Sequence, residues 1–182
     1  GDLLLEAVRL FKENPDVLRQ YQERFRYILV DEYQDTNTVQ YLWLRLLAQG
    51  RNNVCCVGDD DQSIYAWRGA SLENLRVLSS DYPNLQVIKL EQNYRSSQRI
   101  LQAANGLIAA NPKLYPKTLW TDRSEGEALQ CLMHRDEFAE AESVVQRLIA
   151  HRFERKTLWG AYAILYRSNH QAKLFEQMLR KE

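Results

Sequence analysis

Two adjacent acids, Asp31 and Glu32, directly follow a short apolar run at residues 27–30. The run is rich in β-forming residues, which is typical of a buried strand. In open α/β sheets, ligands bind in the crevice outside the carboxyl ends of the strands, so these acids are candidates for chemistry. A carboxylate there can hold Mg²⁺, and its neighbour can orient and deprotonate a water that attacks a phosphoryl group. The alternative interpretation is an acidic loop that follows a core strand.

A second polar turn, at residues 58–70, follows a second predicted strand at residues 53–57. Three successive aspartates in it are followed by a glutamine, two aromatic residues and an arginine: Gln62, Tyr65, Trp67 and Arg68. Two aromatic side chains beside an arginine suit stacking on bases together with a phosphate contact. Stacking contributes roughly 1 to 3 kcal/mol per base, so it can support binding at zero net charge. The alternative is a loop whose aromatic residues pack inward.

A third polar stretch, residues 91–97, follows a third predicted strand at residues 85–90 and contains Tyr94 and Arg95. Three predicted strands therefore each end in polar residues. Because the carboxyl ends of parallel strands meet at one edge of a sheet, this repetition predicts one composite site.

The elements that must position these residues follow from the hydrophobic periodicity. Apolar residues at helical spacing predict helices before the first strand and after each polar stretch. In the helix after the first turn, the predicted apolar stripe is Val39, Leu42, Trp43, Leu46 and Leu47. Further strands are predicted at residues 128–133 and 161–166, each followed by a helix. Alternating strands and helices predict an α/β fold with a parallel sheet flanked by helices.

Composition narrows the classes of function. The chain has 182 residues, and 24 basic residues balance 24 acidic ones. Bulk attraction to nucleic acid is therefore not visible, so any such binding must come from local placement of charge. No apolar run approaches the ~20 residues of a membrane span, and we expect a cytoplasmic protein without membrane contact. The adjacent Cys55 and Cys56 and the distant Cys131 lack metal or disulfide spacing.

Taken together, the three polar stretches resemble motifs of the UvrD/Rep/PcrA group of superfamily 1 DNA helicases, and most closely those of a Rep-like member. The matching segments are VDEYQDTN at residues 30–37, VGDDDQSIYAWRGA at residues 57–70 and LEQNYRS at residues 90–96. Their order and spacing agree with the family, and the resemblance covers essentially the whole chain. A lone acidic motif would be weak, but three long motifs in order are specific.

The resemblance implies a RecA-like P-loop NTPase motor fold that is incomplete in this chain. Residues 1–90 would form the carboxyl-terminal part of a first RecA-like domain, and residues 91–182 the amino-terminal part of a second. The implied cofactors are ATP and Mg²⁺. The implied function is ATP-dependent 3′ to 5′ translocation on single-stranded DNA and unwinding of forked duplex DNA, in replication or repair.

The resemblance also assigns roles at the nucleotide. Asp31 would hold the Mg²⁺ ion, and Glu32 would be the base for the attacking water. Gln62 would sense the γ-phosphate, and Tyr94 would stack on the adenine. Arg95 would act as an arginine finger, a group worth ~10³ to 10⁵ in rate.

The implied DNA contacts fall into two segments. In the second motif, Tyr65 and Trp67 would stack on single-strand bases, and Arg68 would bridge the DNA and nucleotide sites. Farther along, Arg167 and Asn169 would touch the DNA backbone.

One departure from the family is the absence of the P-loop sequence GxxxxGK[ST] from these 182 residues. We therefore expect an internal fragment that binds ATP weakly and does not hydrolyse it alone. Two alternatives stay open: a non-catalytic DNA-binding module with the motor fold, and the helicase part of a RecB- or AddA-type helicase-nuclease. A truncated sheet would also leave an open edge, so dimerisation through that edge is a further hypothesis.

Overall fold

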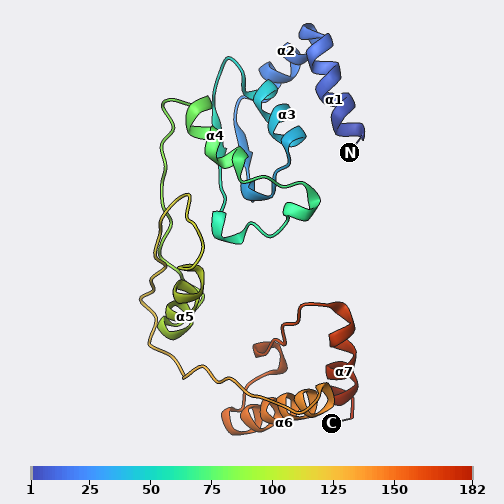
Figure 1. Cartoon of the computed structure of the whole chain (residues 1–182), viewed down its shortest axis with the longest axis vertical. Coiled ribbons are helices and arrows are strands. Elements are labelled where there is room, and N and C mark those ends of the chain that lie inside the picture. Colours follow the sequence, from blue (N-terminus) through green and yellow to red (C-terminus); the bar gives the residue numbers. More distant parts are fainter. Residues whose placement is uncertain (1, 182) are drawn as a thin grey trace. The chain divides into compact units, whose positions relative to one another are not determined.

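The computed structural model of the chain describes residues 2–181, and it divides into two compact units that meet between Glu127 and Ala128. Figure 1 shows the elements of both units. Each unit is described by itself below. The predicted domain boundary between residues 90 and 91 stays a prediction.

The first unit begins with two helices, α1 (Asp2–Glu13) and α2 (Pro15–Arg24), which both pack on α3 (Thr38–Ala48). Val8 and Phe11 are the buried residues of α1. Proline in the first turn of α2 breaks α1 and suits a helix start, because its missing N–H needs no partner there. Both helices confirm the predicted helical segment before the first strand.

A two-stranded parallel sheet lies at the centre of the first unit. Strand β1 (Ile28–Val30) pairs with β2 (Val54–Cys56), and the register matches Leu29 with Cys55. Helix α3 lies between the two strands in the sequence, as a parallel pair requires. Side chains alternate along β2, so Cys55 is exposed and Cys56 is half-buried. The predicted strands at residues 27–30 and 53–57 and the predicted α/β class are confirmed.

The core of this unit forms where the sheet meets two helices. Tyr33 is fully buried among Leu44 of α3 and Leu75 and Leu78 of α4 (Glu73–Asp81), and Ile28 and Val30 pack against them. Burial of four large side chains supplies the main favourable free energy here, at about 25 cal/mol per Å² of apolar area.

Helix α3 buries a face that shares only Leu47 with the predicted stripe. Its buried residues are Tyr41, Leu44, Leu47 and Ala48, whereas Trp43 is 36% exposed. Apolar residues surround most of this helix, so the periodicity alone did not fix its orientation. The contacts that decide it come from the sheet on one side and from α1 and α2 on another.

Three predicted strands are wrong. Residues 85–90, 128–133 and 161–166 form no strand in the described part of the chain, although their apolar composition favours one. A strand needs backbone hydrogen bonds to a neighbouring strand, and these segments lack such a neighbour among residues 2–181. Their large side chains are accordingly exposed, with Ile88 at 79% and Leu165 at 92%.

The rest of the first unit is a helix and a long connection. Helix α5 (Gln98–Ile108) is confirmed, and Ser97 precedes it as the N-cap residue. A parallel bridge joins Gln92 to Trp120, so the chain after α5 returns to the segment before it. The connection that follows α5, which was predicted to be irregular, therefore has defined contacts.

The second unit consists mainly of α6 (Glu137–Arg155) and α7 (Asn169–Leu179), which pack on each other. Asp136 caps α6 by accepting a hydrogen bond from the backbone N–H of Ala139 at 2.8 Å. Both helices confirm the predicted ones. Among residues 2–181, no helix has the length and apolar character that crossing a bilayer requires.

Candidate functional site

The two acids of the first polar stretch lie directly after β1. Both Asp31 and Glu32 are exposed, and the backbone N–H of Glu32 donates to Asp31 Oδ1 at 3.0 Å. Glu32 has φ 50° and ψ 45°, the left-handed region that a side chain with a Cβ enters at a cost of about 1 to 2 kcal/mol. Such strained residues cluster at functional sites.

A buried amide, Gln34, connects this turn to the second one. Gln34 is 1% exposed, its Nε2 donates to Glu32 Oε2 at 2.8 Å, and its Oε1 accepts from the backbone N–H of Asp59 at 3.0 Å. Gly58 allows this approach, because a Cβ there would lie 2.9 Å from Gln34 Oε1. Glu32 and Asp59 are thereby held by one side chain.

Sequence analysis did not single out Gln34. Its place two residues after Glu32, at the carboxyl end of a predicted strand, was a usable signal, since a polar side chain there faces the site. Its burial was not visible in the sequence.

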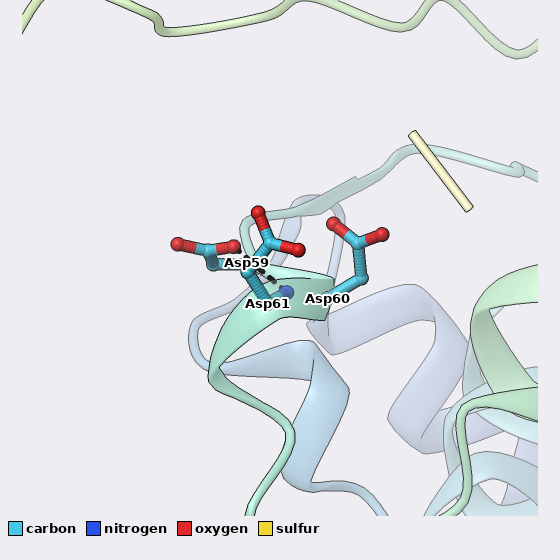
Figure 2. Close-up of side chains that lie close together, drawn as sticks. All are labelled: Asp59, Asp60 and Asp61. Carbon is cyan, nitrogen blue, oxygen red and sulfur yellow. Dashed lines mark hydrogen bonds between the residues drawn. The ribbon is translucent and has the colours of Figure 1, made fainter. Parts of the chain in front are cut away.

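The three aspartates of the second stretch form a tight group. The single-turn helix η2 (Asp60–Gln62) follows Asp59, whose Oδ1 accepts from the backbone N–H of Asp61 at 3.0 Å. Oxygens of the three carboxylates lie within 4.8 Å of one another, on one side of the turn in Figure 2. Gln62 is exposed, and its Nε2 donates to Asp59 Oδ2 at 2.6 Å.

The ammonium group of Lys117 lies among these carboxylates. Its Nζ is 2.7 Å from Asp59 Oδ1, 2.8 Å from Asp60 Oδ1 and 2.9 Å from Asp61 Oδ2. At an effective dielectric of about 20, each pair of like charges at this spacing costs on the order of 3 kcal/mol, which the ammonium offsets. Lys117 was not predicted from the sequence, because Lys117 lies in the irregular connection, far along the chain from the three aspartates.

The ionisation of this group follows from two opposing effects. Burial alone would raise the pKa of Asp59 and of Asp60, but the Lys117 ammonium together with other hydrogen bonds to each carboxylate outweighs burial and holds both values below normal. Burial alone would lower the pKa of Lys117, but its bonds to the three carboxylates raise that pKa above normal. Asp59, Asp60 and Lys117 are therefore charged throughout the neutral pH range.

In the aromatic part of the second stretch, Trp67 is exposed and Tyr65 is half-buried. Tyr65 precedes the turn η3 (Ala66–Arg68), and Trp67 is 75% exposed. The guanidinium of Arg68 lies 5.1 Å from the Tyr65 ring centroid and 4.8 Å from the Trp67 centroid. The two rings are 6.3 Å apart and tilted by 52°. The indole of Trp67 is thus largely accessible to a planar ligand, and a cation lies beside it.

The carboxyl-terminal end of this turn is tied to the first stretch. An isolated bridge joins Ala70 to Asn37, and the backbone N–H of Ser71 donates to Thr36 O at 3.1 Å. Gly69 ends the turn with φ 86°, which glycine adopts without steric cost. The structure thus joins the first two predicted site segments through hydrogen bonds.

The third stretch is arranged by Asn93, whose Oδ1 accepts from the backbone N–H groups of Arg95 at 2.9 Å and Ser96 at 2.7 Å. Tyr94 is 75% exposed, and its hydroxyl donates to Gln92 Oε1 at 2.8 Å. Arg95 is also exposed. In the described part of the chain, no hydrogen bond or ion pair joins Tyr94 or Arg95 to the two acids after β1.

The remaining predicted DNA contacts, Arg167 and Asn169, lie in the second unit. Ser168 forms a capping box with Gln171 at the start of α7, and the backbone N–H of Arg167 donates to Gln171 Oε1 at 3.0 Å. Both predicted residues are exposed at the amino-terminal end of this helix. That end also carries the positive pole of the helix dipole, which suits a phosphate.

The residues present fit an ATP–Mg²⁺ complex in part. An exposed carboxylate at Asp31 suits a hydrated Mg²⁺ ion, and the exposed ring of Tyr94 suits a purine. The phosphate cradle of a P-loop is not among these 182 residues. The aspartate group after β2 is a poorer metal site, because the Lys117 ammonium already lies between its oxygens.

Comparison with known protein families gives two matches that together cover most of the chain. Residues 1–83 match the UvrD/REP helicase N-terminal domain, and residues 88–182 match the UvrD-like helicase C-terminal domain.

Individual relatives agree. The chain is 53% identical to the ATP-dependent DNA helicase Rep of Escherichia coli K12 over 178 residues, which are 98% of this chain and 26% of that relative. It is 48% identical to DNA helicase II of the same organism, over 98% of this chain and 25% of the relative. It is 46% identical to the ATP-dependent DNA helicase PcrA of Bacillus subtilis 168, over 99% of this chain and 24% of the relative. The chain thus spans about a quarter of the length of these relatives.

Proposed function

This chain belongs to the UvrD/Rep helicase family, and we propose that it forms part of an ATP-dependent DNA helicase that moves 3′ to 5′ along single-stranded DNA. Its helices and small parallel sheet are consistent with an incomplete RecA-like motor fold. We assign residues 1–90 to a first motor domain and residues 91–182 to a second. The two family matches, which change over between residues 83 and 88, support this division.

One observation carries the proposal: the Gln34 amide binds both the Glu32 carboxylate and the backbone of Asp59. The proposed base and the turn that contains Gln62 are therefore parts of one hydrogen-bonded unit. A motor needs such a connection, because the residue that activates water must respond to the residue that senses the γ-phosphate.

The proposed roles follow from these positions. ATP–Mg²⁺, when bound, supplies the phosphoryl group that water attacks. Asp31 would hold the hydrated metal, and Glu32 would orient the attacking water and take its proton. Arg95 would offset the charge that develops on the transferred group, and Tyr94 would stack on the adenine.

The DNA-binding proposal rests on the exposed turn after η2. Trp67 would stack on a base beside Tyr65, and Arg68, already over both rings, would meet the backbone phosphate. Arg167 and Asn169 at the start of α7 would contact the same strand farther along. We propose single-stranded DNA and forked duplexes as partners, a cytoplasmic location, and a role in replication or repair.

Replacing Trp67 by alanine tests the stacking. Loss of one stacked base costs roughly 1 to 3 kcal/mol, so we expect the dissociation constant for fluorescent oligo(dT) to rise by about fivefold or more. Trp159→Ala is the matched control, since Trp159 also lies under an arginine, with Arg152 4.3 Å from its ring centroid. Equal affinities of the two variants would contradict the assignment.

Catalysis is tested by a graft, in which the 178 aligned residues replace their counterparts in the Rep helicase of E. coli. We expect DNA-stimulated ATP hydrolysis by the graft, and a decrease in kcat of about 100-fold or more on Glu32→Gln. Glu73→Gln, a change at an exposed acid on α4, is the control. The 182-residue chain alone should bind ATP weakly and not hydrolyse it.

A folded graft without ATPase activity would overturn the helicase proposal. The non-catalytic DNA-binding module would then be the better interpretation, provided that Trp67→Ala still weakens DNA binding.

We also propose that the chain associates with itself through the open edges of its two-stranded sheet. Leu29 on β1 is 72% exposed, so Leu29→Lys should disfavour strand pairing between copies. Leu107→Lys, at an equally exposed leucine of α5, is the control. Sedimentation that shows a monomer at every concentration would exclude this association.

A further inference from the structure

The position of Lys117 is fixed by contacts that are largely shielded from water. Its side chain is 15% exposed, and the carboxylate of Asp60 that it contacts is 6% exposed. Asp60 Oδ2 also accepts from the backbone N–H groups of Leu114 at 3.0 Å and Tyr115 at 3.2 Å. The Asp60 carboxylate therefore binds both the Lys117 ammonium and the backbone of the segment that contains Lys117.

The same segment is fixed on its other side. Leu114 and Tyr115 pack against the core around Tyr33, and the Tyr115 hydroxyl donates to Leu75 O at 3.4 Å. These contacts hold the backbone that carries Lys117 close to the aspartates.

The charge balance makes the turn dependent on this lysine. Three carboxylates project from one turn, as Figure 2 shows, and Lys117 is the cation that pairs with them among the described residues. Without it, like charges would lie within 4.8 Å of one another in a partly dry environment. The carboxylates would then separate or take up protons.

A hydrogen-bonded path leads from Lys117 to Gln62. Asp59 Oδ1 contacts the ammonium at 2.7 Å, and Asp59 Oδ2 accepts from Gln62 Nε2 at 2.6 Å. This one carboxylate therefore links the Lys117 ammonium to the Gln62 amide. Lys117 belongs to the segment that matches the second helicase domain, whereas Asp59 and Gln62 belong to the first.

We propose that Lys117 is a positioning residue, which holds the Gln62 amide in place through Asp59 and ties the segment at 113–118 to the η2 turn. It touches no substrate. The positioning of Gln62 by Lys117 stands independently of the proposed function. Its consequence for catalysis rests on the proposed role of Gln62 at the γ-phosphate.

The test uses the chain itself and nuclear magnetic resonance, with Lys117→Met as the variant. We expect the Gln62 side-chain amide signals to move to those of a solvent-exposed glutamine, and the pKa values measured for Asp59 and Asp60 to rise. Lys117→Arg keeps the charge and should restore much of both signatures. Lys89→Met is the matched control, because Lys89 donates to Pro116 O at 2.6 Å in the same segment but pairs with no aspartate of the turn.

Unchanged Gln62 signals in a folded Lys117→Met chain would overturn the proposal. If that variant does not fold, the unmodified chain decides: the Lys117 ammonium protons should exchange with water at least about tenfold more slowly than those of Lys89, since they are hydrogen-bonded and sheltered. Equal exchange rates would overturn the proposal as well.

The positioning can be separated from the proposed function. In the Rep graft, Lys117→Met should lower kcat for ATP hydrolysis relative to Lys89→Met. A moved Gln62 signal with unchanged kcat would support the positioning and contradict the role assigned to Gln62.

Discussion

At the scale of single residues, the candidate site depends on side chains that have no proposed catalytic role of their own. Gln34 is almost inaccessible to water, yet both ends of its amide are used, one by Glu32 and one by Asp59. A buried amide with both ends bonded is stabilising, but the loss of one partner leaves the other unpaired at a cost of about 1 to 3 kcal/mol. The same residue therefore contributes to stability and to the orientation of the proposed base.

Gln34→Ala should lower the free energy of unfolding by about 2 to 3 kcal/mol, because it leaves the Asp59 N–H without its acceptor and opens a cavity. Urea unfolding followed by circular dichroism measures this change. Gln102→Ala, at an exposed position of α5, should change the free energy by less than about 0.5 kcal/mol. Equal effects of the two substitutions would contradict the buried role.

Tyr33→Phe should leave the stability unchanged or raise it by up to about 1 kcal/mol. The Tyr33 hydroxyl is buried and has no hydrogen-bond partner among the described residues, and burial raises its pKa above normal. Tyr41→Phe is the matched control and should destabilise the protein, because the Tyr41 hydroxyl donates to the Asp81 carboxylate. Thermal unfolding of both variants measures the difference, and a large loss of stability in Tyr33→Phe would show that its hydroxyl has a partner.

At the scale of elements, the sequence predicted the helices well and the strands poorly. Helix boundaries depend on local signals, such as Pro15 at the start of α2 and Asn37 before α3, and these lie within a few residues of the element. A strand depends on a partner elsewhere in the chain. Residues 85–90 have a strand-like composition, but they pair with no strand among residues 2–181.

The candidate site shows the same contrast between local signals and distant contacts. The acids after β1 and the aromatic turn after β2 could be predicted, because each follows a strand that does form. The burial of Gln34 could not be predicted, and neither could Lys117, whose contacts with the aspartates span 56 to 58 positions of sequence. The orientation of α3 was also beyond the sequence, because its apolar residues surround it.

Asn37→Ala should destabilise the first unit by about 1 kcal/mol through the amino-terminal end of α3. Asn37 forms a capping box, in which its Oδ1 accepts from the backbone N–H of Gln40 at 2.9 Å and its own N–H donates to Gln40 Oε1. Asn37→Asp keeps the accepting oxygen and should retain the stability. A drop in the melting temperature that is equal for both variants would argue against capping.

At the scale of the whole molecule, two compact units and a set of exposed apolar segments characterise the chain. The segments that failed to form strands expose Val87, Ile88, Leu90, Met133 and Leu165. An exposed, unpaired segment of this kind favours association between copies. The first unit nevertheless has its own core and a half-buried ion group, so its stability should depend on pH in a specific way.

The stability of the chain should fall on acidification below about pH 4. Lys117 holds the pKa values of Asp59 and Asp60 below their ordinary 3.8, so these acids stabilise the folded state above that pH, and the stabilisation is lost as pH falls through the folded values. The raised pKa of Lys117 means that its contribution is present below pH 10.5 and lost as pH rises through the folded value. Urea unfolding between pH 7 and pH 3 measures this acid-induced loss of stability, which should become smaller in Lys117→Met but not in Lys89→Met, because a rise in the folded pKa values removes the difference from the unfolded state.

The alternation of side chains along β2 places two thiols of very different reactivity next to each other. Burial raises the pKa of Cys56 to about 11, so only about 10⁻⁴ of it is thiolate at pH 7, whereas Cys55 faces solvent. An alkylating reagent should therefore modify Cys55 and the exposed Cys131 at once and Cys56 only when the sheet opens. The delayed third modification, followed by mass spectrometry, would time the opening of β1 from β2 without any label being introduced.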